Sequence, residues 1–123
     1  MITMKEIKAD LAEIKYFYGK QELFQKVCDV YGMCDIVKKV ERYNALICKA
    51  PAKLYELYYH LYVSSNTQEA TADIMCYSPN YIWRLNKQLM KFFFDEINKE
   101  EKAWYAKNIE KIKDFVLQNP WFF

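Results

Sequence analysis

The sequence predicts an all-α protein of five to six helices in one compact domain, residues 1–123. Glycine and proline occur only two and three times, which disfavours turn-rich β architectures. Hydrophobic residues make up 53% of the chain, which excludes a disordered protein. These residues recur at intervals of about 3.6, the period of an α-helix. A single core accommodates a chain of this length, so no second domain is needed.

Two helices are predicted in the first 32 residues. The first follows Thr3, which forms a capping-box pattern with Glu6, and ends near Gly19. The second ends before Gly32, a residue suited to a left-handed C-terminal position. The apolar faces consist of Ile7, Leu11, Ile14 and Tyr18 in the first helix and of Leu23, Phe24, Val27, Val30 and Tyr31 in the second.

Two further helices are predicted between residues 36 and 61. The break between them falls at Pro51, because proline fits only the first turn of a helix. Ser64, Ser65 and Asn66 provide a polar break after the second of these helices. Their apolar faces consist of Ile36, Val37, Val40, Tyr43 and Ile47, and then of Leu54, Leu57, Tyr58 and Leu61.

The next segment predicts two capped helices separated by three residues. Thr67 is a suitable N-cap for a short helix over residues 68–75, and a turn follows at Cys76 and Tyr77. Ser78 caps the next helix, with Pro79 at its first position. In that helix Ile82, Leu85, Leu89 and Phe93 face inward, whereas Arg84, Lys87 and Lys91 face outward.

The sequence leaves the end of this helix open. The helix either runs beyond Phe94 or stops before Asn98, which forms with Glu101 the pattern of a new cap. The final helical segment carries Trp104, Ile109, Ile112, Phe115 and Val116 and ends at Asn119-Pro120.

Residues 67–91 meet the requirements of a helix-turn-helix, which needs a small residue where the helices cross and apolar residues that lock them together. Ala72 is the small residue, Met75 lies on the inner face of its helix, and Tyr77 fills the turn. Ile82 and Leu85 are the buried positions of the second helix.

From Leu54 to Phe93, about a third of the chain, the sequence resembles the sigma factor region 4-like helix-turn-helix of small phage and prophage transcriptional regulators. NTQEATADIM matches the supporting helix and YSPNYIWRLNKQL matches the recognition helix. The resemblance implies that the second helix enters the major groove of double-stranded DNA. Cys76 departs from the glycine often found at the turn. The residues that would face DNA are Ser78, Asn80, Tyr81, Trp83, Arg84 and Lys87.

The chemistry of these side chains suits DNA. Arg84 can bond to the O6 and N7 atoms of guanine or to a phosphate, and Asn80 can pair with an adenine edge or a phosphate. Lys87 and Lys91 are expected to contact phosphates, as are Ser78 and the free N–H groups at its helix start. The net charge is only +2, which is unlike a non-specific nucleic-acid coat, yet residues 79–94 carry three bases and no acid.

The sequence predicts neither an active site nor a cofactor or metal site. His60 is the only histidine, Glu69 and Asp73 have no catalytic companions, and the two glycines are isolated. The four cysteines contain no C-x-x-C pair, so they are expected to be small core residues in a reducing cytoplasm. No signal peptide or membrane span is expected.

Two alternatives accompany the preferred hypothesis of a phage or prophage transcriptional regulator. Small terminase subunits share a similar YSPNY-like turn, which points to DNA packaging. A protein-binding module would instead use Tyr81, Trp83 and the C-terminal aromatics to bind RNA polymerase or another protein, as inhibitors of host defence do. The terminal Trp121-Phe122-Phe123 either folds back on the core or joins a second copy in a homodimer.

Overall fold

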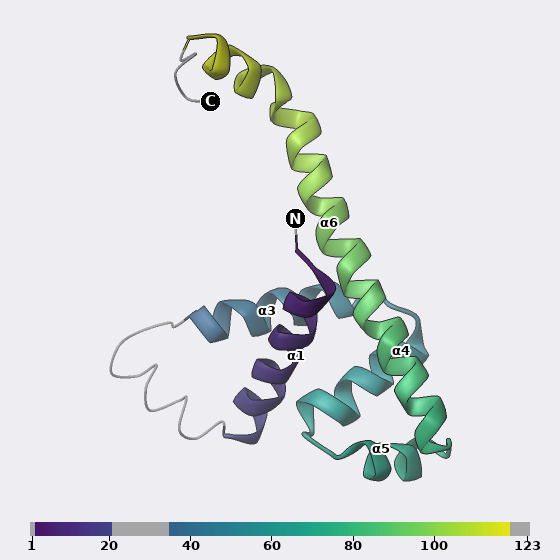
Figure 1. Ribbon diagram of the computed structural model, residues 1–123. Coiled ribbons are helices and arrows are strands. Elements are labelled where there is room, and N and C mark those ends of the chain that lie inside the picture. The colour runs from purple at the N-terminus through teal and green to yellow at the C-terminus, as the bar shows by residue number, and fades with distance from the viewer. Residues whose placement is uncertain (1, 21–34, 119–123) are drawn as a thin grey trace.

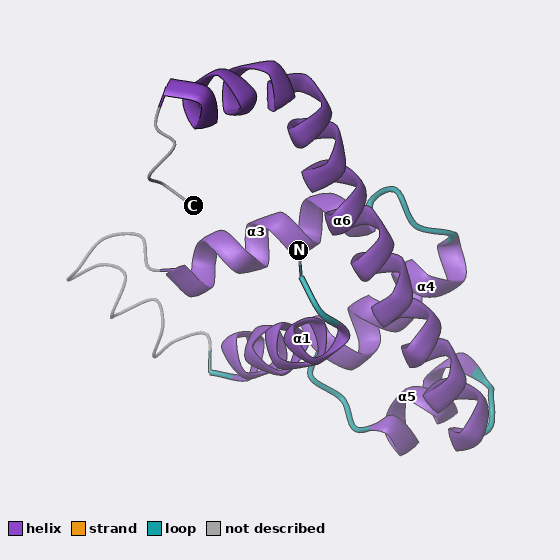
Figure 2. Cartoon of the chain, turned by 45° about the horizontal axis from the view of Figure 1, so that its top comes forward, coloured by secondary structure: helices purple, strands orange, loops and turns teal. Residues whose placement is uncertain are grey.

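The computed structural model describes residues 2–20 and 35–118, and within these ranges it confirms the all-α prediction (Figure 1). Figure 2 shows helices joined by loops, with no strand among the described residues. The predicted helix over residues 23–31 lies outside these ranges, as does the terminal Trp121-Phe122-Phe123. The helices are α1 (Met4–Gly19), α3 (Asp35–Ile47), α4 (Ala52–Tyr58), the π-helical η1 (Tyr59–Val63), α5 (Gln68–Met75) and α6 (Pro79–Gln118).

Three predicted N-caps are confirmed by their hydrogen bonds. The hydroxyl of Thr3 accepts from the N–H of Glu6 at 3.2 Å, and Thr67 accepts from Ala70 at 3.1 Å. The hydroxyl of Ser78 accepts from the N–H of Tyr81 at 3.2 Å. Each bond satisfies one of the N–H groups that a helix start leaves without a partner, so these residues fix where α1, α5 and α6 begin.

The core lies around the first half of α6, which contacts α1, α3, α4 and α5. The ring of Phe93 packs at 4.7 Å from that of Tyr43 and at 5.8 Å from that of Tyr58, measured between centroids. The four inward positions predicted for this helix, Ile82, Leu85, Leu89 and Phe93, are all buried. The amphipathic pattern therefore identified the correct face of the helix.

The helix predicted to begin near Pro51 changes from α-helix to π-helix after about two turns. Pro51 itself precedes α4, and from Tyr59 the chain continues as the π-helix η1. The N–H of Ser64 donates to the carbonyl of Tyr59, five residues earlier, at 2.8 Å. No glycine or proline marks the change, so the sequence pattern predicted a plain α-helix. π-Helical turns are often found at functional sites.

α6 is one continuous helix of 40 residues, which settles the alternative that the sequence left open. Asn98 does not begin a new helix, because it is buried within α6 next to Ile97. Arg42 and Glu100 form a marginal ion pair at 3.9 Å between α3 and α6. Beyond that pair α6 stands away from the other helices in both views (Figures 1 and 2). None of the described helices is long and apolar enough to cross a membrane.

The expectation that the cysteines are core residues is wrong for the two that the structure describes. Cys48 and Cys76 are both exposed, and Cys28 and Cys34 lie outside the described residues. Cys48 follows the last turn of α3, where its thiol donates to the carbonyl of Asn44 at 3.4 Å. Cys76 occupies the turn between α5 and α6. Both positions lie at helix ends, beyond the last residue that faces the core.

Candidate nucleic-acid interface

The turn between α5 and α6 is a Schellman motif built on a non-glycine residue. Cys76 adopts the left-handed conformation, with φ 60° and ψ 40°. The N–H of Tyr77 donates to the carbonyl of Ala72 at 2.9 Å, and the N–H of Cys76 donates to that of Asp73 at 3.3 Å. These two bonds satisfy carbonyls at the end of α5 and redirect the chain into α6. The cysteine therefore takes the conformation for which glycine is usual.

The two helices of this unit are locked by small and aliphatic side chains. Ala72 on α5 is buried and presents no side chain beyond its Cβ, which permits close approach of α6. Ile82 and Leu85 are buried on the facing side of α6. Met75 is partly buried against the same core, as predicted. Tyr77 does not fill the turn as an interior residue; it is 38% exposed and packs against the ring of Tyr81.

Four of the predicted contact residues form one exposed row on α6, which we call the basic stripe: Asn80, Arg84, Lys87 and Lys91. They are spaced at i, i+4, i+7 and i+11, which places them within one narrow arc of the helix. Residues 79–94 contain no acid, so no carboxylate of this segment neutralises the stripe. On α5 both acids, Glu69 and Asp73, are exposed.

The remaining predicted residues are separated by the structure. Positions that are two residues apart on an α-helix are rotated by about 200° from each other. Tyr81 and Trp83 therefore flank the basic stripe on opposite sides. The side chain of Trp83 is 51% exposed, and the Nζ atom of Lys87 lies 3.7 Å from the centre of its ring. Ser78 is exposed, and its hydroxyl oxygen already accepts the capping bond, which leaves its O–H free to donate.

Lys53 of α4 is a neighbour of this interface that the sequence analysis missed. Its Nζ atom donates to the hydroxyl of Tyr81 at 3.1 Å and lies 5.6 Å from the centres of the Tyr77 and Tyr81 rings. The hydrogen bond to Tyr81 is the main cause that raises the pKa of Lys53. No local pattern reveals this contact, because 28 residues separate the two partners. The structure thus adds a cation at the start of α6.

Within the described residues, no three His, Cys, Asp or Glu side chains are grouped so that they could hold a metal ion. Comparison of the chain with protein-family models, curated proteins and solved structures finds no match.

Proposed function

We propose that this chain is a DNA-binding helix-turn-helix protein, with α5 as the supporting helix and α6 as the recognition helix. The observation that carries the proposal is the basic stripe, in which three cations and one amide share an exposed face directly after a capped helix start. An α-helix fits the major groove of B-DNA, where arginine and asparagine read base edges. The sequence resemblance favours a phage or prophage transcriptional regulator; a DNA-packaging terminase subunit would use the same contact.

The proposed DNA contact of each residue depends on its distance from the start of α6. Asn80 and Arg84 lie in the first turns, where a recognition helix meets base edges, so they are assigned to base contacts. Lys87 and Lys91 lie further along and are assigned to phosphates. Ser78 and Lys53 flank the helix start, where the partial positive charge of the dipole favours another phosphate. Glu69 and Asp73 repel phosphates, which confines the contact to Ser78, α6 and Lys53.

The proposal is tested by fluorescence anisotropy with labelled mixed-sequence duplex DNA at several salt concentrations. The wild type is compared with Arg84→Ala/Lys87→Ala and with the control Lys99→Ala/Lys102→Ala, two exposed lysines further along the same helix. The first variant is expected to bind more weakly, and the slope of log K against log salt is expected to fall by about 1, because Lys87 is assigned to a phosphate and Arg84 to a base. An unchanged affinity, or no saturable binding of the wild type at low salt, overturns the proposal.

A second candidate function, binding of a protein partner, is favoured by the far half of α6. Trp104, Tyr105 and Ile109 are 56%, 52% and 40% exposed there, although aromatic side chains are usually covered. Such residues are enriched where proteins meet, including at homodimer interfaces and at sites for RNA polymerase. Light scattering across a range of protein concentrations tests self-association. A monomer at every concentration excludes the homodimer, and a pull-down with RNA polymerase then tests the other partner.

A further inference from the structure

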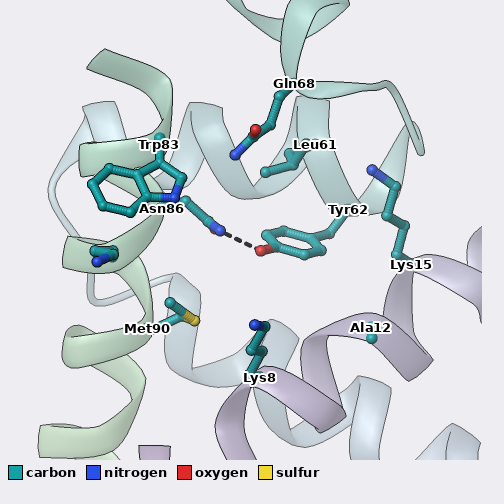
Figure 3. Close-up of a pocket in the computed structure, with 10 residues that line it drawn as sticks. Lys8, Ala12, Lys15, Leu61, Tyr62, Gln68, Trp83, Asn86 and Met90 are labelled. Carbon is teal, nitrogen blue, oxygen red and sulfur yellow. Dashed lines mark hydrogen bonds between the residues drawn. The ribbon is translucent and has the colours of Figure 1, made fainter. Parts of the chain in front are cut away.

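A cavity of about 600 Å³ lies beside the basic stripe, between α1, η1, α5 and α6 (Figure 3). This volume falls within the range of small-molecule sites in proteins. Trp83 and Lys87 belong both to the interface described above and to the cavity wall. The wall consists of Lys8, Ala12, Lys15, Leu61, Tyr62, Gln68, Trp83, Asn86, Lys87 and Met90.

The charged residues of the wall are all cationic. Lys8 and Lys15 come from α1 and Lys87 comes from α6, and no carboxylate lines the cavity. Two acids of α1 are occupied elsewhere: Asp10 and Glu13 both pair with Lys39 of α3, at 3.0 and 2.8 Å. The positive charge of the cavity is therefore not neutralised by its own wall.

Lys15 lies at the cavity and has N–H donors beyond the one that its hydrogen bond uses. Its Nζ atom donates to the carbonyl of Asn66 at 2.6 Å, which uses one of the three N–H bonds of an ammonium group. Burial lowers the pKa of Lys15, because the charged form is desolvated without a carboxylate nearby. An anionic group entering the cavity supplies the missing counter-charge, as phosphate does for lysine in many proteins.

The opposite part of the wall suits a planar ring with polar edges. Trp83 lines the cavity and is half exposed, and aromatic rings of this kind stack with nucleobases. The side chain of Gln68 points into the cavity in Figure 3. The Oδ1 atom of Asn86 accepts from the hydroxyl of Tyr62 at 2.5 Å, which fixes the amide and leaves its NH₂ group free to donate. Side-chain amides recognise base edges by such bonds.

We propose that this cavity binds a nucleotide, with its phosphate attracted by the positive charge of Lys8, Lys15 and Lys87 and its base stacked on Trp83. Gln68 and Asn86 contact the edge of the base. The cavity wall provides both ammonium groups and an indole ring, which match the two halves of such a ligand, an anionic group and a planar base. This site does not depend on the DNA-binding function, because its ligand is a free small molecule and its residues on α1, η1 and α5 lie outside the basic stripe.

The test is isothermal titration calorimetry of the full chain, without DNA, using AMP, GMP, CMP and UMP as probes. The matching nucleosides, ribose 5-phosphate and inorganic phosphate are titrated in parallel. At least one mononucleotide is expected to bind saturably with one-to-one stoichiometry, and each half-ligand about tenfold more weakly, because it lacks either the charged or the stacking contact. No saturable binding of any mononucleotide overturns the proposal, as does phosphate alone binding equally well.

Three variants locate the ligand within the molecule. Lys8→Glu and Trp83→Leu change exposed residues and are each expected to weaken nucleotide binding about tenfold or more. Lys38→Glu makes the same charge change at an exposed position of α3 away from the cavity and is expected to leave binding unchanged. Circular dichroism confirms that each variant is folded. Equal binding by wild type and folded Lys8→Glu and Trp83→Leu places the ligand elsewhere and overturns the assignment.

Discussion

The Nζ atom of Lys87 lies 3.7 Å from the centre of the Trp83 ring, and both side chains stand at the boundary between the basic stripe and the cavity. A cation over an indole ring is held there with an energy of about 0.5–1 kcal/mol at an exposed site. A DNA phosphate and a nucleotide phosphate both attract the same ammonium group. The two proposed sites are therefore coupled through one residue.

This coupling predicts that DNA and nucleotide compete. A saturating concentration of the mononucleotide preferred in calorimetry is expected to weaken DNA binding, because Lys87 cannot serve two phosphates at once. DNA anisotropy titrations with and without the nucleotide measure the effect. In Lys8→Glu, which lacks part of the nucleotide site, the nucleotide is expected to leave DNA affinity unchanged. Equal DNA affinity of the nucleotide-saturated and free wild type contradicts the coupling.

Two neighbours on α6 are predicted to differ sharply in their contribution to stability. Leu85 is 2% exposed, so Leu85→Ala is expected to lower the free energy of unfolding by about 2–5 kcal/mol. Trp83 is 51% exposed, so Trp83→Ala is expected to cost less than about 1 kcal/mol despite the larger side chain removed. Urea denaturation followed by circular dichroism compares the two. Similar losses in both variants contradict the orientation of α6.

Cys76 is predicted to be a strained position that glycine relieves. A Cβ atom in the left-handed conformation costs about 1–2 kcal/mol, and glycine avoids that cost. Cys76→Gly is therefore expected to unfold at higher urea than Cys76→Ala, which removes the thiol but retains the Cβ atom. A difference of about 1 kcal/mol in favour of glycine is expected. Alanine as stable as glycine at this position argues against the left-handed turn.

The two threonines of the α5 segment are predicted to respond in opposite directions to the same substitution. Thr71 is fully buried and its hydroxyl has no hydrogen-bond partner, so Thr71→Val is expected to stabilise the fold by about 1 kcal/mol. Thr67 caps the helix through the N–H of Ala70, so Thr67→Val is expected to destabilise it by about 1 kcal/mol. Thermal unfolding followed by circular dichroism measures both. A loss of stability in Thr71→Val indicates that its hydroxyl is bonded in solution.

Alkaline pH is predicted to destabilise the fold through Tyr62. Burial raises the pKa of its hydroxyl from 10.0 to about 12, against a smaller lowering by the bond with Asn86. Because the folded-state pKa lies above the unfolded value, the contribution is complete below pH 10.0 and is lost as the pH rises through about 12. The loss from this residue amounts to about 3 kcal/mol. Burial also raises the pKa of Tyr43 and Tyr58, so all three contribute to the decline.

Urea denaturation at increasing pH measures this decline, with tyrosinate absorbance as a second observable. Tyr62→Phe removes one ionising group, so its unfolding free energy is expected to fall less steeply above pH 10.0 than that of the wild type. The exposed Tyr105 provides a matched control, since Tyr105→Phe is expected to retain the wild-type slope. Parallel slopes for wild type and Tyr62→Phe contradict the assigned shift.

Much of the candidate site could be predicted because its determinants are local. The caps at Thr67 and Ser78 and the inward positions Ile82 and Leu85 follow from residues within two turns of each other. The same reasoning grouped Tyr81 with Trp83 as residues that face DNA, whereas positions two residues apart on a helix are rotated by about 200° and lie on opposite flanks of the basic stripe. Which flank then meets α4 and which meets α1 depends on how the helices pack.

The sequence by itself determined the all-α class, the starts of α1, α5 and α6, and the exposed face at the start of α6, because capping and periodicity act over a few residues. Only the tertiary structure decided the continuity of α6 past Asn98, the pairing of Lys53 with Tyr81 and the cavity behind Trp83. These features join residues far apart in the chain, such as Lys15 and Asn66, which are 51 positions apart. Packing of the whole core brings such residues together, and no local sequence pattern indicates which residues will meet.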